Sequence, residues 1–337
     1  MQALFYILVA VAIGVGIWQM AKFFELSKTV ATTDDNNIQG KYMILFLAGF
    51  YLYMIYTVLK WKHVFLPGAA SVEGVEYDHL WTITMVVISF VQIVTQFLLF
   101  YFSYRFRGIE GRKAAYETDS TKLEVIWTAV PTIVLTVLIG YGLLVWTNVM
   151  DNSDSEDPLY IEVYAQQFNW QARYAGDDNT LGRANVRYIK GINTMGVDMT
   201  DVNSQDDIPV RELHLPKGRK IIFKFRSQDV LHSAYMPHFR AQMNCVPGMI
   251  TEFGFTPSMT TEEMRKDPDT MRKVRGINKI RAEKGEDPYE FDYLLLCNKI
   301  CGSSHYSMQM KIIVHEEEEF NEWLASQDRM NQVVVNN

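Results

Sequence analysis

Charged residues are missing from four long stretches in the first half of the chain and are frequent after it. The stretches are Met1 to Ala21, Tyr42 to Leu59, Leu80 to Tyr104 and Val125 to Met150. Each is about long enough to cross a hydrocarbon core of ~30 Å as an α-helix. The first stretch lacks the basic start and small-residue cleavage site of a signal peptide, so we interpret it as a span. The pattern predicts a four-span membrane anchor followed by a water-exposed domain from Asp151 onward.

Short runs of strand-forming residues dominate the second half of the chain. They predict strands over Tyr160 to Tyr174, Ile221 to Phe225, Phe291 to Leu296 and Met310 to His315. The first run reads as one long strand, whose period of two places Tyr164, Gln166, Phe168 and Trp170 on one face. The charged segment Glu262 to Lys284 predicts a helical surface excursion. The four glutamates from Glu316 to Glu319 predict the start of a C-terminal helix that ends before Asn331.

The loops between the spans differ in their Lys and Arg content, which sets the orientation in the membrane. Two basic residues lie between Lys60 and His79, whereas five lie between the third and fourth spans: Arg105, Arg107, Arg112, Lys113 and Lys122. The loop between the third and fourth spans is therefore expected to face the cytoplasm. Both termini and the whole domain after Asp151 would lie on the opposite side.

The chain has 337 residues, a net charge of −7 and three cysteines. It shows no internal repeat and no glycine-rich phosphate-binding motif, and we expect no nucleic acid as a partner. The negative charge favours a basic protein partner, and the Asp177 to Asp207 carboxylates are a candidate docking surface for one. Attraction of this kind would be screened beyond ~8 Å at physiological salt.

The segment from Cys297 to Met308 holds two thiols, an imidazole and a thioether on a loop between two predicted strands. Thiolate and thioether are soft donors that suit copper, and a Cys, His and Met set is typical of electron transfer. Two cysteines suggest two metal ions.

Other readings of the same residues are a Cys297–Cys301 disulfide, a structural zinc site, and Met308 as plain core. The zinc site would use Cys297, Cys301, His305 and His232, but zinc has no use for the thioether. Cys245 has no partner motif and is expected to be a small buried side chain. His238 is expected to be an ordinary polar side chain.

The loop resembles the dinuclear copper (CuA) loop of the cytochrome c oxidase subunit II family, whose pattern is C-x-E-x-C-x-x-x-H-x-x-M. Asp229-Val230-Leu231-His232-Ser233, followed by Pro247-Gly248, matches the family's D-V-x-H-S and P-G segments. The resemblance implies two bridging thiolates, two capping imidazoles, a weak axial thioether and one backbone carbonyl. These ligands would be Cys297, Cys301, His232, His305, Met308 and the carbonyl of Lys299.

Lys299 stands where the family usually carries Glu. In the family that carboxylate reaches a magnesium or manganese ion at the subunit I interface, and an ammonium cannot ligate such an ion. We therefore expect copper binding to survive and this second ion to be absent. The other possibility is that Lys299 turns into water and the ion stays on other ligands.

The predicted third and fourth spans resemble the family's membrane hairpin, because Glu124 to Pro131 reads E-V-I-W-T-A-V-P against the family's E-x-I-W-T-x-x-P. The resemblance makes Glu124 a candidate for the mouth of a proton path into subunit I. Otherwise it is a solvated carboxylate at a helix start. The family's Q-W-Y-W motif is reduced here to Gln167-Phe168-Asn169-Trp170. Phe168 and Trp170 are candidates for electron entry, although Phe168 could equally fill the space between two sheets.

The resemblance implies a cupredoxin-like Greek-key β-sandwich, an all-β domain, on an α-helical membrane anchor. We divide the chain into an extra membrane hairpin (1–79), the family hairpin (80–150) and a periplasmic domain with its C-terminal helix (151–337). Copper would be this chain's cofactor, whereas haem and CuB would lie in subunit I. The expected location is a bacterial inner membrane, and the expected partners are subunits I and III, lipid, a soluble or tethered cytochrome c, and a respiratory supercomplex.

The implied activity is that of a proton-pumping cytochrome c oxidase that reduces oxygen to water. Two rival readings are a quinol-oxidase subunit II, which lacks the copper ligands, and a membrane-anchored copper-binding or assembly protein. The latter would not need the E-x-I-W-T-x-x-P hairpin.

Overall fold

The computed structural model describes residues 2–26, 31–116, 118–152 and 157–335. It divides into two compact units, one of residues 1–62 and 85–128 and the other of residues 63–84 and 129–337. We describe each unit by itself.

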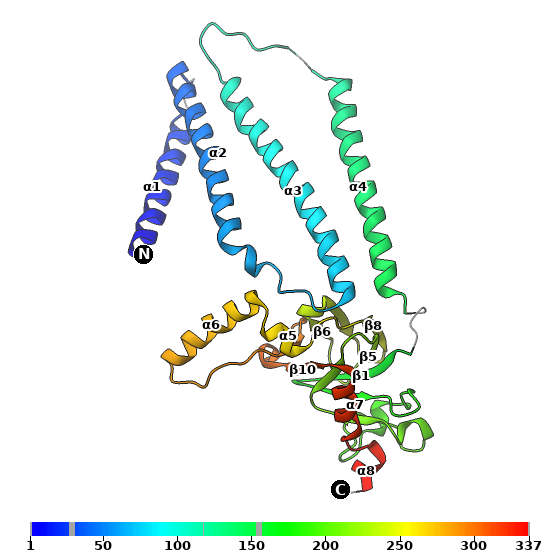
Figure 1. The fold of residues 1–337 in the computed structure, drawn as a ribbon. Helices are drawn as coiled ribbons and strands as arrows, with labels where there is room; N and C mark the ends of the chain where they lie inside the picture. The colour runs from blue at the N-terminus through cyan, green and yellow to red at the C-terminus, as the bar shows by residue number, and fades with distance from the viewer. Residues whose placement is uncertain (1, 27–30, 117, 153–156, 336–337) are drawn as a thin grey trace. The chain divides into compact units, whose positions relative to one another are not determined.

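Long helices make up the N-terminal part of the described chain (Figure 1). They are α1 (Gln2–Leu26), α2 (Thr33–Trp61), α3 (Val72–Arg105) and α4 (Thr121–Met150). α2, α3 and α4 are long and apolar enough to cross a membrane, and α1 contains a shorter apolar stretch, Val9–Lys22. Most apolar side chains of these helices are exposed. Such surfaces are stable only in lipid or against other membrane proteins, so the chain is a membrane protein.

Two residues at the start of α4 test the sequence reading. Glu124 lies in the first turn of α4, as predicted. Pro131, however, lies in the helix interior, because the helix begins at Thr121 and not at Val125. Pro131 therefore removes one intrahelical hydrogen bond from α4.

Ten strands of the described residues form two five-stranded sheets, in the orders β3-β2-β1-β5-β8 and β4-β10-β9-β6-β7. Their bounds are β1 Leu159–Gln166, β2 Asn169–Tyr174, β3 Ile208–Val210, β4 Leu213–Pro216, β5 Ile221–Ser227, β6 His232–Met236, β7 Ala241–Cys245, β8 Thr251–Phe255, β9 Tyr293–Cys297 and β10 Gln309–His315. Neighbouring strands are antiparallel except β1 with β5 and β4 with β10, which are parallel. This all-β sandwich confirms the predicted cupredoxin-like fold.

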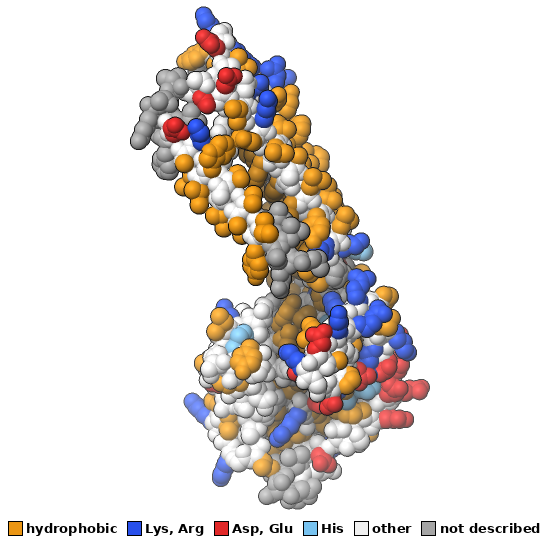
Figure 2. Space-filling model, turned by 90° about the vertical axis from the view of Figure 1, so that its left-hand side faces the viewer, with side chains coloured by type: hydrophobic (Ala, Val, Ile, Leu, Met, Phe, Trp, Pro, Cys, Tyr) orange, Lys and Arg blue, Asp and Glu red, His pale blue; other side chains and the backbone are white. Residues whose placement is uncertain are grey.

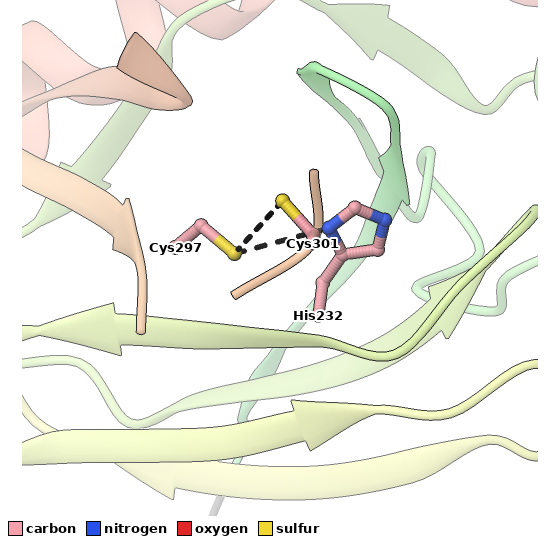
Figure 3. A group of neighbouring side chains, drawn as sticks. All are labelled: His232, Cys297 and Cys301. Carbon is pink, nitrogen blue, oxygen red and sulfur yellow. Dashed lines mark hydrogen bonds between the residues drawn. The ribbon is translucent and has the colours of Figure 1, made fainter. Parts of the chain in front are cut away.

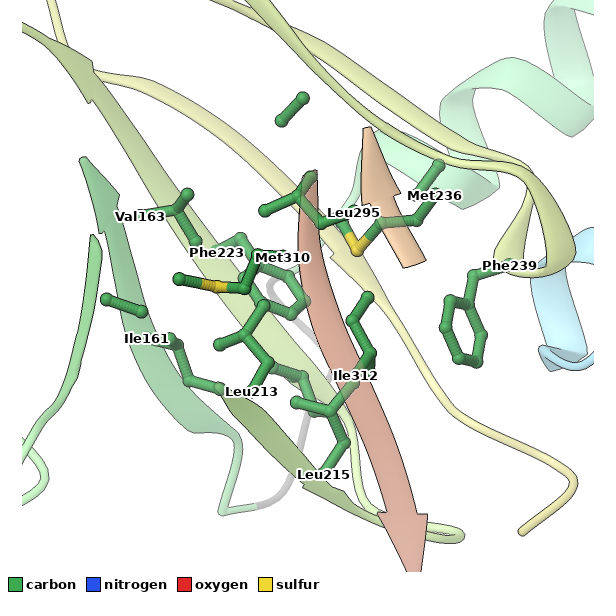
Figure 4. Packing of buried hydrophobic residues seen from close by; sticks show 14 of the residues in the cluster. Ile161, Val163, Leu213, Leu215, Phe223, Met236, Phe239, Leu295, Met310 and Ile312 are labelled. Carbon is green, nitrogen blue, oxygen red and sulfur yellow. The ribbon is translucent and has the colours of Figure 1, made fainter. Parts of the chain in front are cut away.

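The two sheets enclose one apolar core (Figure 4). Ile161 and Phe223 from one sheet and Leu213 and Ile312 from the other have no exposed surface. Alternate residues of each strand supply this core, as the period of a strand requires. The packed core gives the loops at the strand ends a rigid base.

The prediction of a single strand from Tyr160 to Tyr174 is wrong. The segment is the hairpin of β1 and β2, with Gln167 and Phe168 as its two-residue turn and Ala165 paired with Trp170. Both strands alternate, so a two-residue turn leaves the period of two unbroken and invisible in the sequence. The turn moves Phe168 off the sheet face on which it was predicted.

Helices interrupt and end the sandwich domain. The predicted excursion between β8 and β9 is confirmed as two helices, α5 (Thr261–Arg265) and α6 (Pro268–Glu283). α7 (Glu317–Ala325) is the predicted C-terminal helix, and α8 (Met330–Val335) follows it.

A buried ionic cluster fixes the long 177–207 loop to the first sheet. Arg173 on β2, 1% exposed, donates to Glu162 at 2.6 Å and to the carboxylate of Asp207. Arg226 on β5 donates to Glu162 as well. Burial raises the pKa of Asp207 to about 7 despite the neighbouring guanidinium. Asp207 is therefore inside the fold and is no part of a docking surface.

Two further carboxylates of this loop are also used internally. Asp198 and Asp201 both form ion pairs with Arg183. The pKa of each carboxyl lies below its ordinary value. The main cause is the hydrogen bond from the Thr200 hydroxyl for Asp198, and the hydrogen bond from the Arg183 backbone N–H for Asp201. The loop therefore offers fewer free charges for docking than its composition predicts.

Candidate metal centre

The predicted donors come from two loops that neighbouring strands bring together. His232 is the first residue of β6 and Cys297 the last of β9, and these strands pair with Ala234 opposite Cys297. The backbone N–H of Asn298 donates to the carbonyl of Ser233 at 2.9 Å, and that of Cys297 to the carbonyl of Met308 at 3.1 Å. The first bond attaches the donor loop to β6, and the second joins the two ends of the loop.

The thiols of Cys297 and Cys301 face each other and the imidazole of His232 (Figure 3). The Sγ–Sγ distance is 3.8 Å, and Cys297 Sγ lies 3.8 Å from His232 Nδ1. The ligand atoms of the three residues all lie within 4.8 Å of one another. Both cysteines are free, so the disulfide reading does not describe this structure.

The remaining predicted donors surround the same two sulfurs. His305 Nδ1 lies 3.6 Å and Met308 Sδ 3.9 Å from Cys301 Sγ. The carbonyl oxygen of Lys299 lies 3.2 Å from Cys297 Sγ. Metal bonds of about 2.3 Å to sulfur and about 2.0 Å to imidazole nitrogen place tetrahedral donors about 3.5 to 3.8 Å apart. The distances among the sulfur and nitrogen donors are therefore close to those that a metal requires.

Three of the predicted donors are buried, whereas Cys297 and His305 are partly exposed. His232 has no exposed surface, Met308 is 2% exposed and Cys301 is 5% exposed. Burial raises the pKa of the Cys301 thiol to about 11, with the neighbouring Cys297 as the next cause. A thiol of this kind releases its proton when a metal ion takes its place.

Three neighbouring residues that sequence reasoning left without a role, two with polar side chains and one glycine, lie beside the predicted ligands. Asp229 Oδ1 lies 2.9 Å from His232 Nε2, and its Oδ2 accepts from the backbone N–H of Gln167 at 2.7 Å. Although burial opposes it, these bonds hold the pKa of Asp229 below its ordinary value. The Gln167 amide in turn donates to the carbonyl of Cys301. Asp229 belongs to the D-V-L-H-S match, which was the signal that could have identified it.

Gly302 is the third of these positions. Its φ of +141° is a conformation that other residues rarely adopt, and a Cβ there would lie 2.8 Å from the ring of Phe168. Phe168 therefore packs directly on the donor loop. The sequence marks this contact only by a glycine next to Cys301.

The two aromatic candidates differ in exposure. Trp170 is 1% exposed, and its indole N–H lies 3.4 Å from the carbonyl of Met308, with its ring 6.2 Å from that of His232. Phe168, in the turn before it, is partly exposed. Only Phe168 can therefore touch a molecule outside the domain.

Two other predicted side chains lie outside the donor set. Cys245 on β7 has no exposed surface, which confirms a small buried side chain, and burial raises the pKa of its thiol to about 12. His238 lies edge-on between the rings of Phe291 and Tyr293, where burial lowers its pKa to about 4.

Comparisons with known proteins identify relatives of the chain. A family model described as the transmembrane domain of cytochrome c oxidase subunit II matches residues 58–145. The chain is 34% identical over 253 residues to an alternative cytochrome c oxidase subunit 2 of Bradyrhizobium diazoefficiens, which covers 74% of this chain and 79% of the relative. It is 23% identical over 287 residues to cytochrome c oxidase subunit 2 of Synechocystis, which covers 79% and 76%.

Two solved structures show weaker likeness. The periplasmic domain of cytochrome oxidase subunit II of Bradyrhizobium japonicum matches with 18% identity and a TM-score of 0.30, over 51% of this chain and 94% of that one. A chain of a heme-copper terminal oxidase dimer matches with 14% identity and a TM-score of 0.29, over 57% and 99%. Overlaps this weak carry none of the conclusions below.

Proposed function

The chain belongs to the cytochrome c oxidase subunit II family, and from this membership we propose that its sandwich domain holds a dinuclear copper centre. Six groups would hold it: the side chains of His232, Cys297, Cys301, His305 and Met308 and the carbonyl of Lys299. The observation that carries the proposal is the pair of free thiols 3.8 Å apart, one beside His232 and the other beside His305. Two sulfurs each beside a different imidazole suit two ions that share them.

The donor chemistry favours copper over zinc. Structural zinc sites are closed by four nitrogen, sulfur or carboxylate ligands, and this site adds a buried thioether close to Cys301. A thioether is a soft ligand typical of copper electron-transfer sites. Met308 therefore supports the copper reading over a plain core role.

A copper centre held by these residues would supply one-electron redox chemistry, which would let the chain take electrons from a cytochrome c and pass them to haem in subunit I. The residues of this chain prepare the site for that task. Asp229 fixes the ring of His232, and Gln167 holds the loop at Cys301. Donors fixed by packed strands move little when the charge changes, which keeps the reorganisation energy low.

Exposed apolar side chains beside the ligands suit a protein partner. Ile300, between the two cysteines, is 87% exposed, and Tyr306, next to His305, is 88% exposed. Side chains of this size gain stability when a partner covers them. Subunit I, which receives the electron, is the partner that this surface would meet. Phe168 would lie under the incoming cytochrome, with Trp170 between it and the copper ligands.

The remaining roles follow from the family and the topology. Glu124, in the first turn of α4, would open a proton path on the cytoplasmic side. The sandwich domain would lie in the periplasm of a bacterium whose inner membrane holds α2, α3 and α4. Subunit III would complete the complex. The Lys299 ammonium would take the place of the family's interface cation.

The test is the copper content and spin-resonance spectrum of the oxidase purified through a tag on this chain. We expect two coppers bound to this chain, a mixed-valence signal with hyperfine coupling to both, and oxidation of cytochrome c. Copper bound to a chain that copurifies with no haem subunit would instead support the assembly-protein reading. Absence of copper from an active oxidase would contradict the proposal.

A further inference from the structure

α6 carries a charge opposite to that of the chain as a whole. Its sixteen residues include five basic and two acidic side chains, a net charge of +3, whereas the chain has −7. Its basic residues are Arg272, Lys273, Arg275, Lys279 and Arg281. The helix is well formed at its start, because the side chain of Asp267 accepts from two backbone N–H groups of the first turn. A stable, basic helix in an acidic protein indicates an anionic partner.

One face of α6 holds it against the domain. Thr270 is 6% exposed, Val274 packs on the core, and the Asn278 side chain exchanges two hydrogen bonds with the backbone of Tyr289. These positions lie on one side of the helix at 3.6 residues per turn. The other side is therefore free of the domain.

The free side of α6 presents a basic stripe. At 100° per residue, Arg272, Arg275 and Lys279 lie together, opposite the attached face. All three are exposed. Among the described residues, Arg272 forms an ion pair only with Asp269, three residues earlier in the same helix. No ion pair of the described residues includes Arg275 or Lys279.

Apolar side chains flank the stripe. Met271 is 42% exposed on one side, and Ile280 is 56% exposed on the other. Figure 2, which views the molecule from the side on which α6 projects, shows basic, acidic and hydrophobic side chains intermixed on this face. A basic stripe bordered by aliphatic groups is typical of a helix that lies in a membrane interface.

The root of this excursion is attached to the segment that enters α3. The backbone N–H of Ser258 donates to the carbonyl of Ala70 at 2.8 Å, and Met264 of α5 packs against Gly68. At the start of α3 itself, Glu73 accepts from the backbone N–H of Thr256 at 2.8 Å. These residues all belong to the same compact unit.

This attachment places α6 near the headgroup layer. The uncharged part of α3 begins at Leu80, so the eight residues before it rise about 12 Å above the hydrocarbon core. The headgroup layer itself is about 5 to 8 Å deep on each side. The gap is within one Debye length at physiological salt and within reach of long basic side chains.

We propose that α6 docks on the membrane surface and binds anionic phospholipid headgroups through Arg272, Arg275 and Lys279. The flanking Met271 and Ile280 would enter the boundary between headgroups and acyl chains. An acidic protein partner would also suit the charge, but it would not need aliphatic side chains at the height of the bilayer surface. The helix gives the domain a second attachment to the membrane, in addition to α3 and α4.

Hydrogen exchange of the full chain in lipid nanodiscs tests the proposal. Amides of residues 271–281 would be compared in phosphatidylcholine and in phosphatidylcholine with phosphatidylglycerol. We expect exchange to slow about tenfold or more in the anionic lipid and to recover at 0.5 M salt, roughly the effect of three basic groups near an anionic surface. The measurement needs no copper, so it is independent of the proposed metal centre.

Matched variants identify the side chains responsible. The triple variant Arg272→Gln, Arg275→Gln, Lys279→Gln should lose the difference between the two lipids. The control Arg187→Gln, Lys190→Gln, Arg211→Gln, which removes three exposed cations elsewhere in the domain, should keep it. Equal exchange in both lipids for the unaltered chain would overturn the proposal. So would protection that appears only in the presence of other oxidase subunits.

Discussion

The ring nitrogen Nε2 of His232 lies 2.9 Å from Oδ1 of Asp229, three residues earlier in the same loop. The other ring nitrogen, Nδ1, faces the thiol of Cys297. The carboxylate therefore orients the imidazole, as the carboxylate partners of metal-binding histidines commonly do.

Replacing Asp229 by Ala should weaken copper binding by about 10- to 100-fold, the usual cost of losing such a partner. Asp229→Asn keeps a hydrogen-bond acceptor and should recover part of the loss. Competition with a copper chelator measures the affinity. Asp178→Asn, on an exposed loop, is the matched control. Equal affinities for all variants would show that His232 needs no support.

Replacing Cys301 by Ser should abolish the mixed-valence spin-resonance signal, because one remaining thiolate bridge cannot hold two ions at bonding distance. The control is Cys245→Ala, which removes a buried thiol that is not a donor. That variant should keep the signal, with a loss of stability of about 1 kcal/mol for the small cavity. A mixed-valence spectrum from Cys301→Ser would refute the shared-thiolate assignment.

Replacing Glu124 by Ala should slow oxidase turnover while leaving the reduction of copper by the donor unchanged. The expected separation arises because Glu124 would deliver protons and take no part in electron entry. Stopped-flow reduction and steady-state oxygen consumption measure the two steps. Glu110→Ala, on the preceding loop, serves as the control. Turnover at the unaltered rate would exclude the proton role.

Lys299 predicts the absence of a manganese ion at the subunit interface. Oxidase from cells grown with manganese should show no bound-manganese spin-resonance signal, and Lys299→Glu should create one, because a carboxylate is the oxygen ligand that such an ion requires. Copper content should be equal in both, since the Lys299 ligand is its backbone carbonyl. A manganese signal in the unaltered oxidase would mean that other residues hold the ion.

Replacing the buried Arg173 should be among the substitutions that most reduce the stability of the domain. Arg173→Leu leaves Asp207 buried without its cation and Glu162 with Arg226 alone, and it should cost about 3 to 5 kcal/mol of unfolding free energy. Arg183→Leu removes an ion pair whose cation is 73% exposed and should cost at most about 1 kcal/mol. Denaturant unfolding of the full chain in detergent compares the two. Similar losses of unfolding free energy in the two variants would mean that burial does not determine how much an ion pair stabilises the domain.

The donor set of the proposed metal centre could be identified from the sequence because the spacing from Cys297 to Met308 and the segment around His232 resemble those of the family. The apolar spans were equally predictable, since lipid requires long uncharged runs. The hairpin turn at Gln167 and Phe168 could not be, because two short alternating strands and one long strand share the same period. The attachment of Asp207 to Arg173 was also hidden, because it joins positions 34 residues apart through a loop with no regular pattern.

The pairing of Ala234 with Cys297 has a consequence for how the domain acquires its metal. During synthesis His232 leaves the ribosome long before either cysteine does, and domains generally fold as units once their last strands are available. An unfinished nascent chain therefore offers an imidazole without its thiolates, too few ligands to retain copper tightly. If the proposed copper centre is correct, copper would be retained only after the second sheet has closed, so retained copper would report a completed fold.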